Sequence, residues 1–371
     1  MFGLAFPNLS MGIDYHRSSI TAGLLQRSLL QYLENGIIRR RRRFDAQRMF
    51  MSVPGRVTIG IPTINRSQLV LRSIRSALAQ TYADIEVIVS DDASTDDTVE
   101  RIREIQDRRV VLFQQKNRLG LVGNFDFCLR NASGEFFLLL GDDDLLLPTA
   151  IRRLIEPFLY QSAGLHPSAV GAVWCPCWIA NTEGKRLWIT ESGPPRETSA
   201  SMIAALFAGN RGSRLSSILV RTEDALSVGG YEKSHGDQCD LGNWGRAALL
   251  HEYIVCIDEP LVQYTNHHGS TTSQSSIRQW QEWACIMHAD LLASARASRD
   301  PNAERKIKSS KKNLDSSVML GILIQTFGKP GWIRNALFQG LRNPRAMLSP
   351  YMFKRLVKDG RKVMNLRRSS K

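Results

Sequence analysis

Short apolar runs alternate with longer amphipathic segments along the first half of the chain. The apolar runs are rich in Val, Ile, Leu and Phe, as buried strands are, and lie at 57–61, 85–89, 110–113 and 136–140. The segments between them have apolar residues at helical spacing and lie at 68–80, 96–106 and 121–130. This alternation predicts an α/β fold, with a mostly parallel, doubly wound sheet covered by helices on both faces.

The pattern is less regular after residue 150. We expect strands at 170–179, 215–220 and 254–257 and a helix at 239–250. Beyond about residue 300 the chain is helical in character and punctuated by Lys and Arg. The expected divisions are a basic extension over 1–50, a folded domain over 51–300 with halves 51–150 and 151–300, and a basic helical tail over 301–371.

Residues 1–50 have little periodicity and end close to five consecutive arginines, Arg39 to Arg43. The folded pattern begins only after Met51. Two interpretations stay open: the true start is Met49 or Met51, or the segment is a disordered basic arm.

Positive charge is concentrated at the two ends. The chain carries 49 Lys and Arg against 35 Asp and Glu, a formal net charge of +14. Residues 1–50 contribute +5 and residues 305–371 contribute +15, which leaves −6 for residues 51–304. Because the basic residues lie outside the predicted sheet and no recognition motif accompanies them, nucleic acid is not expected as a partner.

The six cysteines form no pair of CxxC motifs, which favours reduced thiols over a zinc site. No run reaches the ~18 consecutive apolar residues that a membrane-spanning helix needs. The N-terminus also lacks the pattern of a secretory signal. We therefore expect a cytoplasmic protein.

Acidic residues follow the predicted strands at the edge where α/β sheets bind ligands. Asp91 and Asp92 follow the second strand, and Asp142, Asp143 and Asp144 come just after the fourth. Adjacent carboxylates at a buried strand end repel each other, and a divalent cation such as Mg²⁺ or Mn²⁺ removes that cost. The alternatives are an acidic turn for the triplet and a helix-capping turn after Asp91 and Asp92.

Four segments in order carry a family resemblance: 61–66 (IPTINR), 89–98 (VSDDASTDDT), 117–120 (NRLG), and 132–136 (ASGEF), which runs into the Asp triplet. Together they resemble the family 2 inverting glycosyltransferases, over about 51–275. The resemblance implies a Rossmann-like GT-A fold, with a nucleotide-sugar-binding half at 51–150 and an acceptor half at 151–300. It also implies a nucleotide-diphosphate sugar donor and a divalent metal, Mn²⁺ or Mg²⁺.

The resemblance assigns roles to individual residues. Thr63, Asp91 and Asp92 are expected to hold the nucleoside, and the triplet is the family's DxD-type motif. Its register favours Asp142 and Asp143 as metal or donor contacts, with Asp144 third. Further expected donor contacts are Pro62, Asn65, Asn117 and Arg246.

Inverting transfer needs a base that removes the acceptor proton. In similar enzymes this Asp follows a Glu and begins a helix, with an Arg six residues on. Asp240 lies six residues before Arg246 and is the first candidate, although Cys239 replaces the Glu. Asp237 is the second candidate, and a helix N-cap is the structural alternative for Asp240.

The segment 259–270 resembles the closing segment of the family, and it places His267 near the metal or diphosphate. Thr265 stands where the family usually has Arg. A surface histidine is the alternative for His267.

The basic tail contains scattered aromatic residues, which is typical of helices that lie on anionic membranes. We therefore expect attachment to the inner face of the plasma membrane, against the alternative of a solvated basic helix. The family resemblance implies a function in cell-surface polysaccharide assembly, namely inverting transfer of a sugar to a saccharide acceptor that could be lipid-linked. Two alternatives stay open: a nucleotidyltransferase, and a non-catalytic nucleotide-sugar-binding protein with a decayed site.

Overall fold

The computed structural model describes residues 52–161, 164–266, 277–298 and 300–326, which belong to one compact unit. The predicted extension over 1–50 and the tail beyond residue 326 lie outside the described residues. Within the described part, no helix is long and apolar enough to cross a membrane.

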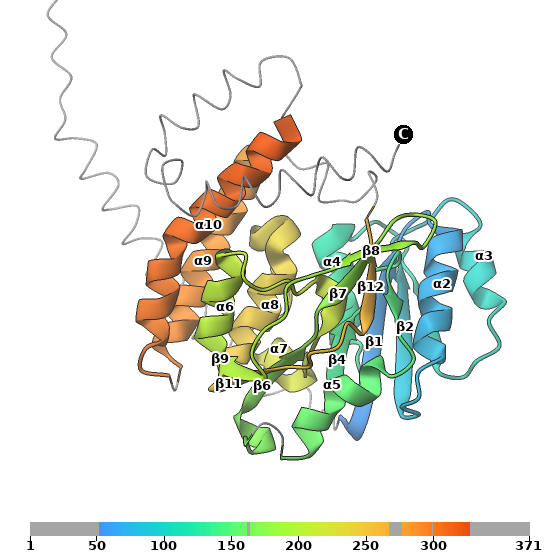
Figure 1. Ribbon diagram of the computed structural model, residues 1–371. Coiled ribbons are helices and arrows are strands. Elements are labelled where there is room, and N and C mark those ends of the chain that lie inside the picture. Colours follow the sequence, from blue (N-terminus) through green and yellow to red (C-terminus); the bar gives the residue numbers. More distant parts are fainter. Residues whose placement is uncertain (1–51, 162–163, 267–276, 299, 327–371) are drawn as a thin grey trace, which may run out of the picture. The chain divides into compact units, whose positions relative to one another are not determined.

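An eight-stranded sheet forms the centre of this unit, in the order β3-β2-β1-β4-β10-β6-β11-β9 (Figure 1). Its strands are β3 (Val110–Gln114), β2 (Ile85–Asp91), β1 (Val53–Thr63), β4 (Gly134–Leu139), β10 (Ile218–Arg221), β6 (Val170–Trp174), β11 (Tyr253–Cys256) and β9 (Arg196–Thr198). The first four strands are parallel to one another, β10 is antiparallel to both of its neighbours, and β11 runs parallel to β6. The predicted mostly parallel sheet is confirmed.

Helices cover both faces of the sheet. They are α2 (Ser67–Leu78), α3 (Thr98–Arg103), α4 (Gly120–Arg130), α5 (Ala150–Leu159), α6 (Ser199–Phe207), α7 (Thr222–Ser227), α8 (Cys239–Ala248), α9 (Ile277–Arg296) and α10 (Ala303–Thr326). Phe136 and Leu138 of β4 pack into a core with α2 and α5, whereas Phe137 and Leu139 pack into a second core with α4, α6 and α8. The alternation of side chains along a strand thus supplies both cores.

A second sheet of four strands has the order β5-β12-β7-β8, with β5 (Leu145–Leu146), β12 (Val262–Thr265), β7 (Cys177–Ala180) and β8 (Arg186–Ile189). The predicted single strand at 170–179 is therefore wrong. It is divided at Cys175 and Pro176 into β6 of the large sheet and β7 of the small one. Proline has no N–H for a strand ladder, which explains the break.

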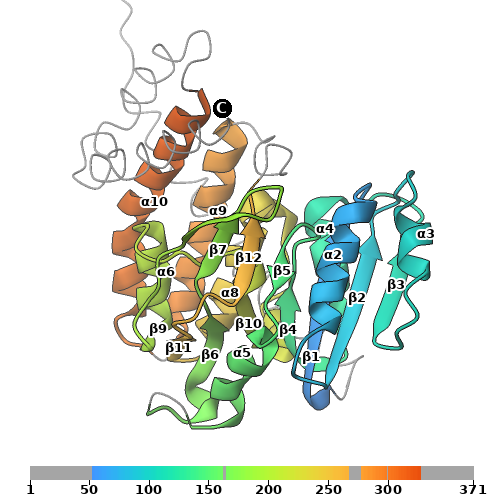
Figure 2. The same ribbon diagram turned by 45° about the vertical axis from the view of Figure 1, so that its right-hand side comes forward.

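The C-terminal helices belong to the folded unit. α9 and α10 lie side by side in both ribbon views, and α10 also packs against α6 (Figure 2). Met287 of α9 and Ile307 of α10 are fully buried in the same core as α8. The predicted domain boundary at residue 300 therefore lies between α9 and α10, two helices that share one hydrophobic core.

Candidate active site

The carboxyl ends of β1, β2 and β4 meet at one edge of the large sheet. β1 pairs with β2 on one side and with β4 on the other, so the chain reverses its direction of sheet growth at β1. Ligands of open α/β sheets bind at such switch points. The acidic residues that follow β2 and β4 thus lie at one edge of the sheet, as predicted, together with the polar residues that follow β1.

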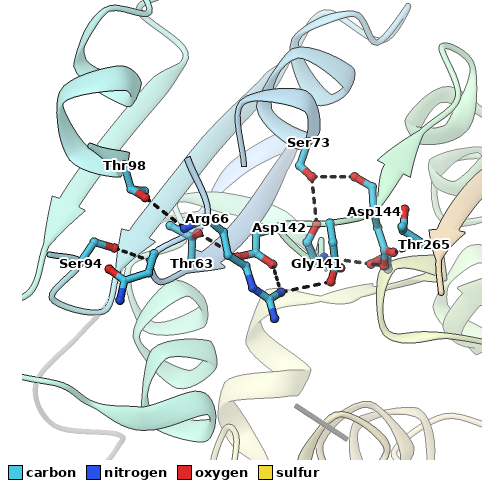
Figure 3. Close-up of polar contacts among 12 residues, drawn as sticks. Thr63, Arg66, Ser73, Ser94, Thr98, Gly141, Asp142, Asp144 and Thr265 are labelled. Carbon is cyan, nitrogen blue, oxygen red and sulfur yellow. Dashed lines mark hydrogen bonds and ion pairs between the residues drawn. The ribbon is translucent and has the colours of Figure 1, made fainter. Parts of the chain in front are cut away.

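Asp142 bridges this switch point (Figure 3). The Thr63 hydroxyl at the end of β1 donates to Oδ2 of Asp142 over 2.8 Å. The Arg66 guanidinium donates through Nη1 to Oδ1 of Asp142 over 2.8 Å and to Oδ2 of Asp143 over 3.1 Å. Burial raises the pKa of Asp142 to about 6, although Arg66 acts in the opposite direction. Asp142 and Asp143 therefore form a carboxylate pair that shares one cation.

Asp144 is 1% exposed, and protein groups bind both of its carboxyl oxygens. The Ser216 hydroxyl donates to Oδ2 over 2.6 Å, and the Thr265 N–H donates to Oδ1 over 3.0 Å. Burial, with repulsion from Asp143, raises the pKa of Asp144 to about 8. Asp144 thus joins the rim of the large sheet to β12 of the small sheet, and its role as a metal ligand stays a prediction.

Asp92 is bound to the beginning of α4. Its Oδ1 accepts the Leu119 N–H, its Oδ2 accepts the Gly120 N–H over 3.1 Å, and its own N–H donates to the Thr63 carbonyl over 2.9 Å. A carboxylate at a helix N-terminus satisfies N–H groups that have no partner within the helix. These contacts show how Asp92 fixes α4 against the rim, and the predicted nucleoside contact stays a prediction.

The loops after β1 and β2 are held together by Asn65 and Ser94. The Asn65 N–H donates to the Ser94 hydroxyl over 2.8 Å, and Oδ1 of Asn65 accepts the Thr95 N–H over 2.8 Å. Asp91 accepts the Ser94 N–H over 3.0 Å. Asn65 and Ala93 have φ of 51° and 59°, which alanine rarely adopts. Backbone strain of this kind concentrates at ligand-binding loops.

Two further predicted donor contacts also lie at this rim. Pro62 is buried in β1, where it pairs with Ser90 of β2. Asn117 is exposed in the loop between β3 and α4. Both stay predictions as donor contacts.

Asp240 lies in the first turn of α8, where the sequence predicts a helix start. Burial raises the pKa of Asp240 to about 6, and the N–H groups of the first turn and Arg214 oppose the rise. A carboxyl group with this pKa is mostly ionised at neutral pH and can accept a proton. Asp237 lies just before α8, and its charge raises the pKa of Asp240 further.

Arg214, which belongs to no sequence motif, and Tyr264, from the segment 259–270, link Asp240 to the triplet. The Arg214 guanidinium lies over the Tyr264 ring, 5.6 Å from its centroid. Burial raises the pKa of Tyr264 to about 12, and the charges of Asp144, Asp143 and Asp240 all add to this rise. The charges of Asp143 and Asp144 in the triplet and of Asp240 in α8 therefore all act on the Tyr264 hydroxyl. Arg214 and Tyr264 are far apart in the sequence, so their contact could not be predicted before the fold was known.

The loop before α8 is fixed by α9. His235 is fully buried, and its Nε2 donates to Oδ2 of Asp290 over 2.8 Å. Gly236 has φ 51°, and a Cβ at this position would lie 2.0 Å from the Trp283 ring. Glycine is thus required where the loop passes under the indole. Both contacts lie next to the two candidate bases, Asp237 and Asp240.

Arg246 supports α8 from inside the protein. It is 7% exposed and donates to the carbonyls of Gly242 and Gly230 and to Oε1 of Glu232, over 2.6, 3.0 and 2.9 Å. These contacts hold the loop before α8 against the helix. The predicted contact of Arg246 with the donor stays a prediction. His267 lies outside the described residues.

The rim has the chemistry of a site for Mg²⁺ or Mn²⁺. Within the described residues, no group of three or more His, Cys, Asp or Glu side chains is placed to hold a metal. Mg²⁺ in proteins often takes only one or two carboxylates and leaves its other positions to water and substrate phosphates. Asp142 and Asp143 supply two such carboxylates, which the Arg66 guanidinium bridges in the donor-free protein.

The segment that contains this rim matches a known protein family. Residues 58–172 match the model of Glycosyl transferase family 2. Over 104 residues the chain is 39% identical to a GalNAc(5)-diNAcBac-PP-undecaprenol beta-1,3-glucosyltransferase of Campylobacter jejuni, covering 27% of this chain and 34% of the relative. Over 100 residues it is 35% identical to the UDP-Glc:alpha-D-GlcNAc-diphosphoundecaprenol beta-1,3-glucosyltransferase WfaP of Escherichia coli, covering 27% and 40%. The chain thus spans well under half the length of these relatives.

The similarity to solved structures extends over more of the chain. S. aureus TarS 1–349 in complex with UDP-GlcNAc is similar with a TM-score of 0.52 and 15% identity, covering 82% of this chain and 92% of that one. The same protein in complex with UDP gives a TM-score of 0.53 and 13% identity. At this identity the similarity shows the fold alone. That fold is GT-A, as the sequence predicts.

Proposed function

Since residues 58–172 are a family 2 glycosyltransferase domain on a GT-A fold, we propose that the chain transfers a sugar from a nucleotide-diphosphate donor to a saccharide acceptor, with inversion. One observation carries this proposal. Asp142 and Asp143 share the Arg66 guanidinium at the switch point, and the charges of Asp143 and of Asp240, a carboxyl group suited to act as a base, both act on Tyr264.

The donor is a nucleotide sugar, for which UDP-sugars are the first candidates. Two relatives of the matched segment are named as glucosyltransferases, one of them with UDP-Glc as donor, and TarS has been solved with UDP-GlcNAc. The nucleoside binds at the loops after β1 and β2, and its diphosphate lies toward Asp142 and Asp143. Asp142 and Asp143 would hold a divalent cation, which would neutralise the charge that develops on the leaving diphosphate.

Asp240 is the general base. Its carboxylate removes the proton from the acceptor hydroxyl as that oxygen attacks the anomeric carbon. The new C–O bond forms on one face while the bond to the diphosphate breaks on the other, so the configuration inverts. Arg214 stabilises the ionised form of Asp240 before the transfer. Asp237 is the second candidate for the same role.

The acceptor is a lipid-linked saccharide in cell-surface polysaccharide assembly. This part of the proposal is supported by the printed acceptors of both relatives, which are undecaprenol-linked saccharides. An enzyme that uses such an acceptor works at the inner face of the plasma membrane. The basic segment over 305–371 supplies positive charge for an anionic membrane surface.

The test is a donor screen with the full chain and Mn²⁺ or Mg²⁺, which follows release of the nucleoside diphosphate. Synthetic undecaprenyl-diphosphate saccharides serve as acceptors, and mass spectrometry identifies the product. We expect one donor to give acceptor-dependent release and a product heavier by one sugar. The proposal fails if no donor reacts with any acceptor.

Two controls separate this function from the alternatives. Asp240→Asn should abolish transfer, whereas a nucleotidyltransferase would retain activity because it has no need of Asp240. Release of pyrophosphate from a nucleoside triphosphate would directly support that alternative. Tight binding of UDP-sugar without turnover, unchanged in Asp240→Asn, would indicate a decayed site.

A further inference from the structure

Arg66 occupies the position between the two carboxylates that are expected to bind metal. Its Nη1 lies 2.8 Å from Oδ1 of Asp142 and 3.1 Å from Oδ2 of Asp143 (Figure 3). The Arg66 N–H donates to the Thr98 hydroxyl over 3.1 Å, which fixes the backbone at the beginning of α2. The guanidinium can therefore move only by rotation of its own side chain.

Repulsion between the two carboxylates explains why the Arg66 guanidinium lies between them when no nucleotide sugar is bound. The side chains of Asp142 and Asp143 are 9% and 16% exposed, so water screens their mutual repulsion poorly. Hydrogen bonds from a guanidinium to two carboxylates are short and charge-assisted. Any second cation that binds the same two oxygens has to displace this one.

We propose that Arg66 holds Asp142 and Asp143 in the donor-free enzyme and moves onto the donor diphosphate when a divalent cation replaces it. This inference rests on the proposed function, because it needs a diphosphate donor. Arginine suits both partners, since its planar donors match carboxylate and phosphate oxygens equally well.

The exchange has a measurable consequence for the order of binding. A metal ion alone must displace Arg66 into solvent, which costs the free energy of two charge-assisted hydrogen bonds. A metal ion that arrives with a nucleoside diphosphate gives Arg66 a new partner. Metal and nucleotide should therefore bind cooperatively, and the cooperativity should depend on Arg66.

The experiment measures Mn²⁺ binding by electron paramagnetic resonance at pH 8, with and without UDP, in the full chain. In Arg66→Ala we expect Mn²⁺ alone to bind about tenfold more tightly than in the wild type, because no charged hydrogen bonds are lost. In the same variant UDP should improve Mn²⁺ binding much less than in the wild type. Arg66→Lys keeps a positive charge but lacks the planar guanidinium. Its affinity for Mn²⁺ should lie between those of the wild type and Arg66→Ala.

Arg75→Ala is the matched control, because Arg75 is an exposed arginine of α2, the helix that begins directly after Arg66. It should bind Mn²⁺ like the wild type in both conditions. Circular dichroism shows whether each variant is folded, and Arg66→Lys tests the inference independently if Arg66→Ala is not.

The inference is overturned if Arg66→Ala binds Mn²⁺ alone no more tightly than the wild type, or if the effect of UDP is unchanged. This outcome is distinct from failure of the proposed function. Sugar transfer without Arg66-dependent Mn²⁺ binding would refute the exchange and leave the transferase standing. Binding of Mn²⁺ and UDP that depends on Arg66, without transfer to any acceptor, would support the exchange and refute the transferase.

Discussion

The Nε2 of His235 donates to Oδ2 of Asp290 over 2.8 Å, and the imidazole is fully buried. His235 lies in the loop before α8, and Asp290 lies in α9, 55 residues further along the chain. The loop carries Asp237 and leads directly into Asp240. The position of the candidate base therefore depends on a helix that lies outside the matched segment 58–172.

His235→Ala should lower kcat by about 10- to 100-fold while the KM for the donor changes little, because small displacements of a catalytic group have effects of this size. Steady-state kinetics at saturating acceptor measures both values. The matched control is His251→Ala. His251 makes a similar bond to Asp224, 2.7 Å long, on another part of the chain. A drop in kcat of equal size in both variants would contradict a positioning role for His235.

The rate of transfer should rise with pH through a pKa near 6. Only ionised Asp240 accepts the acceptor proton, and burial raises the pKa of this group to about 6. Below pH 6 the protonated form dominates and kcat/KM falls, whereas above about pH 7 kcat/KM reaches a plateau. The measurement is kcat/KM for the acceptor from pH 5 to 8, with calorimetry to show that the chain stays folded.

Arg214→Ala should move this acidic limb to higher pH. Arg214 lowers the pKa of Asp240 in the wild type. Removal of Arg214 therefore raises that pKa and narrows the pH range over which the transfer rate is maximal. Arg211→Ala is a useful control, because Arg211 pairs with Glu197 over 2.7 Å instead. An unchanged pH profile in Arg214→Ala would argue against the link between Arg214 and the base.

Asp144→Asn should stabilise the metal-free protein at alkaline pH. The pKa of Asp144 rises from 3.8 to about 8 on folding, so between these values the folded chain holds more protons than the unfolded chain. Stability therefore falls as pH rises from about 4 to about 8, and the full loss is present above pH 8. Asparagine carries no charge to bury, so the variant should gain on the order of 1 kcal/mol or more at pH 8.5.

Thermal unfolding in EDTA at pH 5 and pH 8.5 measures this effect. The gain should be small at pH 5 and large at pH 8.5. Asp97→Asn serves as the control, because Asp97 is 57% exposed and its charge is not buried on folding. Equal melting temperatures of Asp144→Asn and the wild type at pH 8.5 would show that Asp144 is not a destabilising charge.

Gly236→Ala should destabilise the fold more than Gly120→Ala. Both glycines have positive φ, 51° and 75°, and Gly236 also has ψ of −132°, a combination that residues with a Cβ rarely adopt. Substitution at residue 236 therefore costs on the order of 1 to 3 kcal/mol of backbone strain. A Cβ at residue 236 also meets the Trp283 ring at 2.0 Å, whereas one at residue 120 meets nothing within 4 Å. Urea unfolding of both variants measures the difference, and the Trp283→Leu background should remove its steric part.

The first half of the fold could be predicted because its signals are local. Apolar runs such as 136–140 and helical spacing in 121–130 need no partner to be recognised, and both were found at nearly the predicted residues. The rim carboxylates followed from the same pattern, since parallel strands end at one edge of a sheet.

The rest of the site depends on contacts between distant segments. Ser216 and Thr265 bind Asp144 from 72 and 121 residues away. Ser216 belongs to no motif, and Thr265 departs from the motif that contains it, because the family usually has Arg at this position. Arg214 and Tyr264 meet only because β12 pairs with β7 beside the large sheet. The break at Pro176 had a local signal, because proline rarely lies inside a central strand.

The two bonds to Asp144 also limit how enzymes of this kind can be recombined. Asp144 belongs to the segment that matches the family model, but Ser216 and Thr265 lie beyond its end at residue 172. A chimera that exchanges only residues 58–172 would place a foreign triplet against these two donors. Active chimeras should therefore be found where the crossover keeps the triplet together with the turn before β10 and with β12.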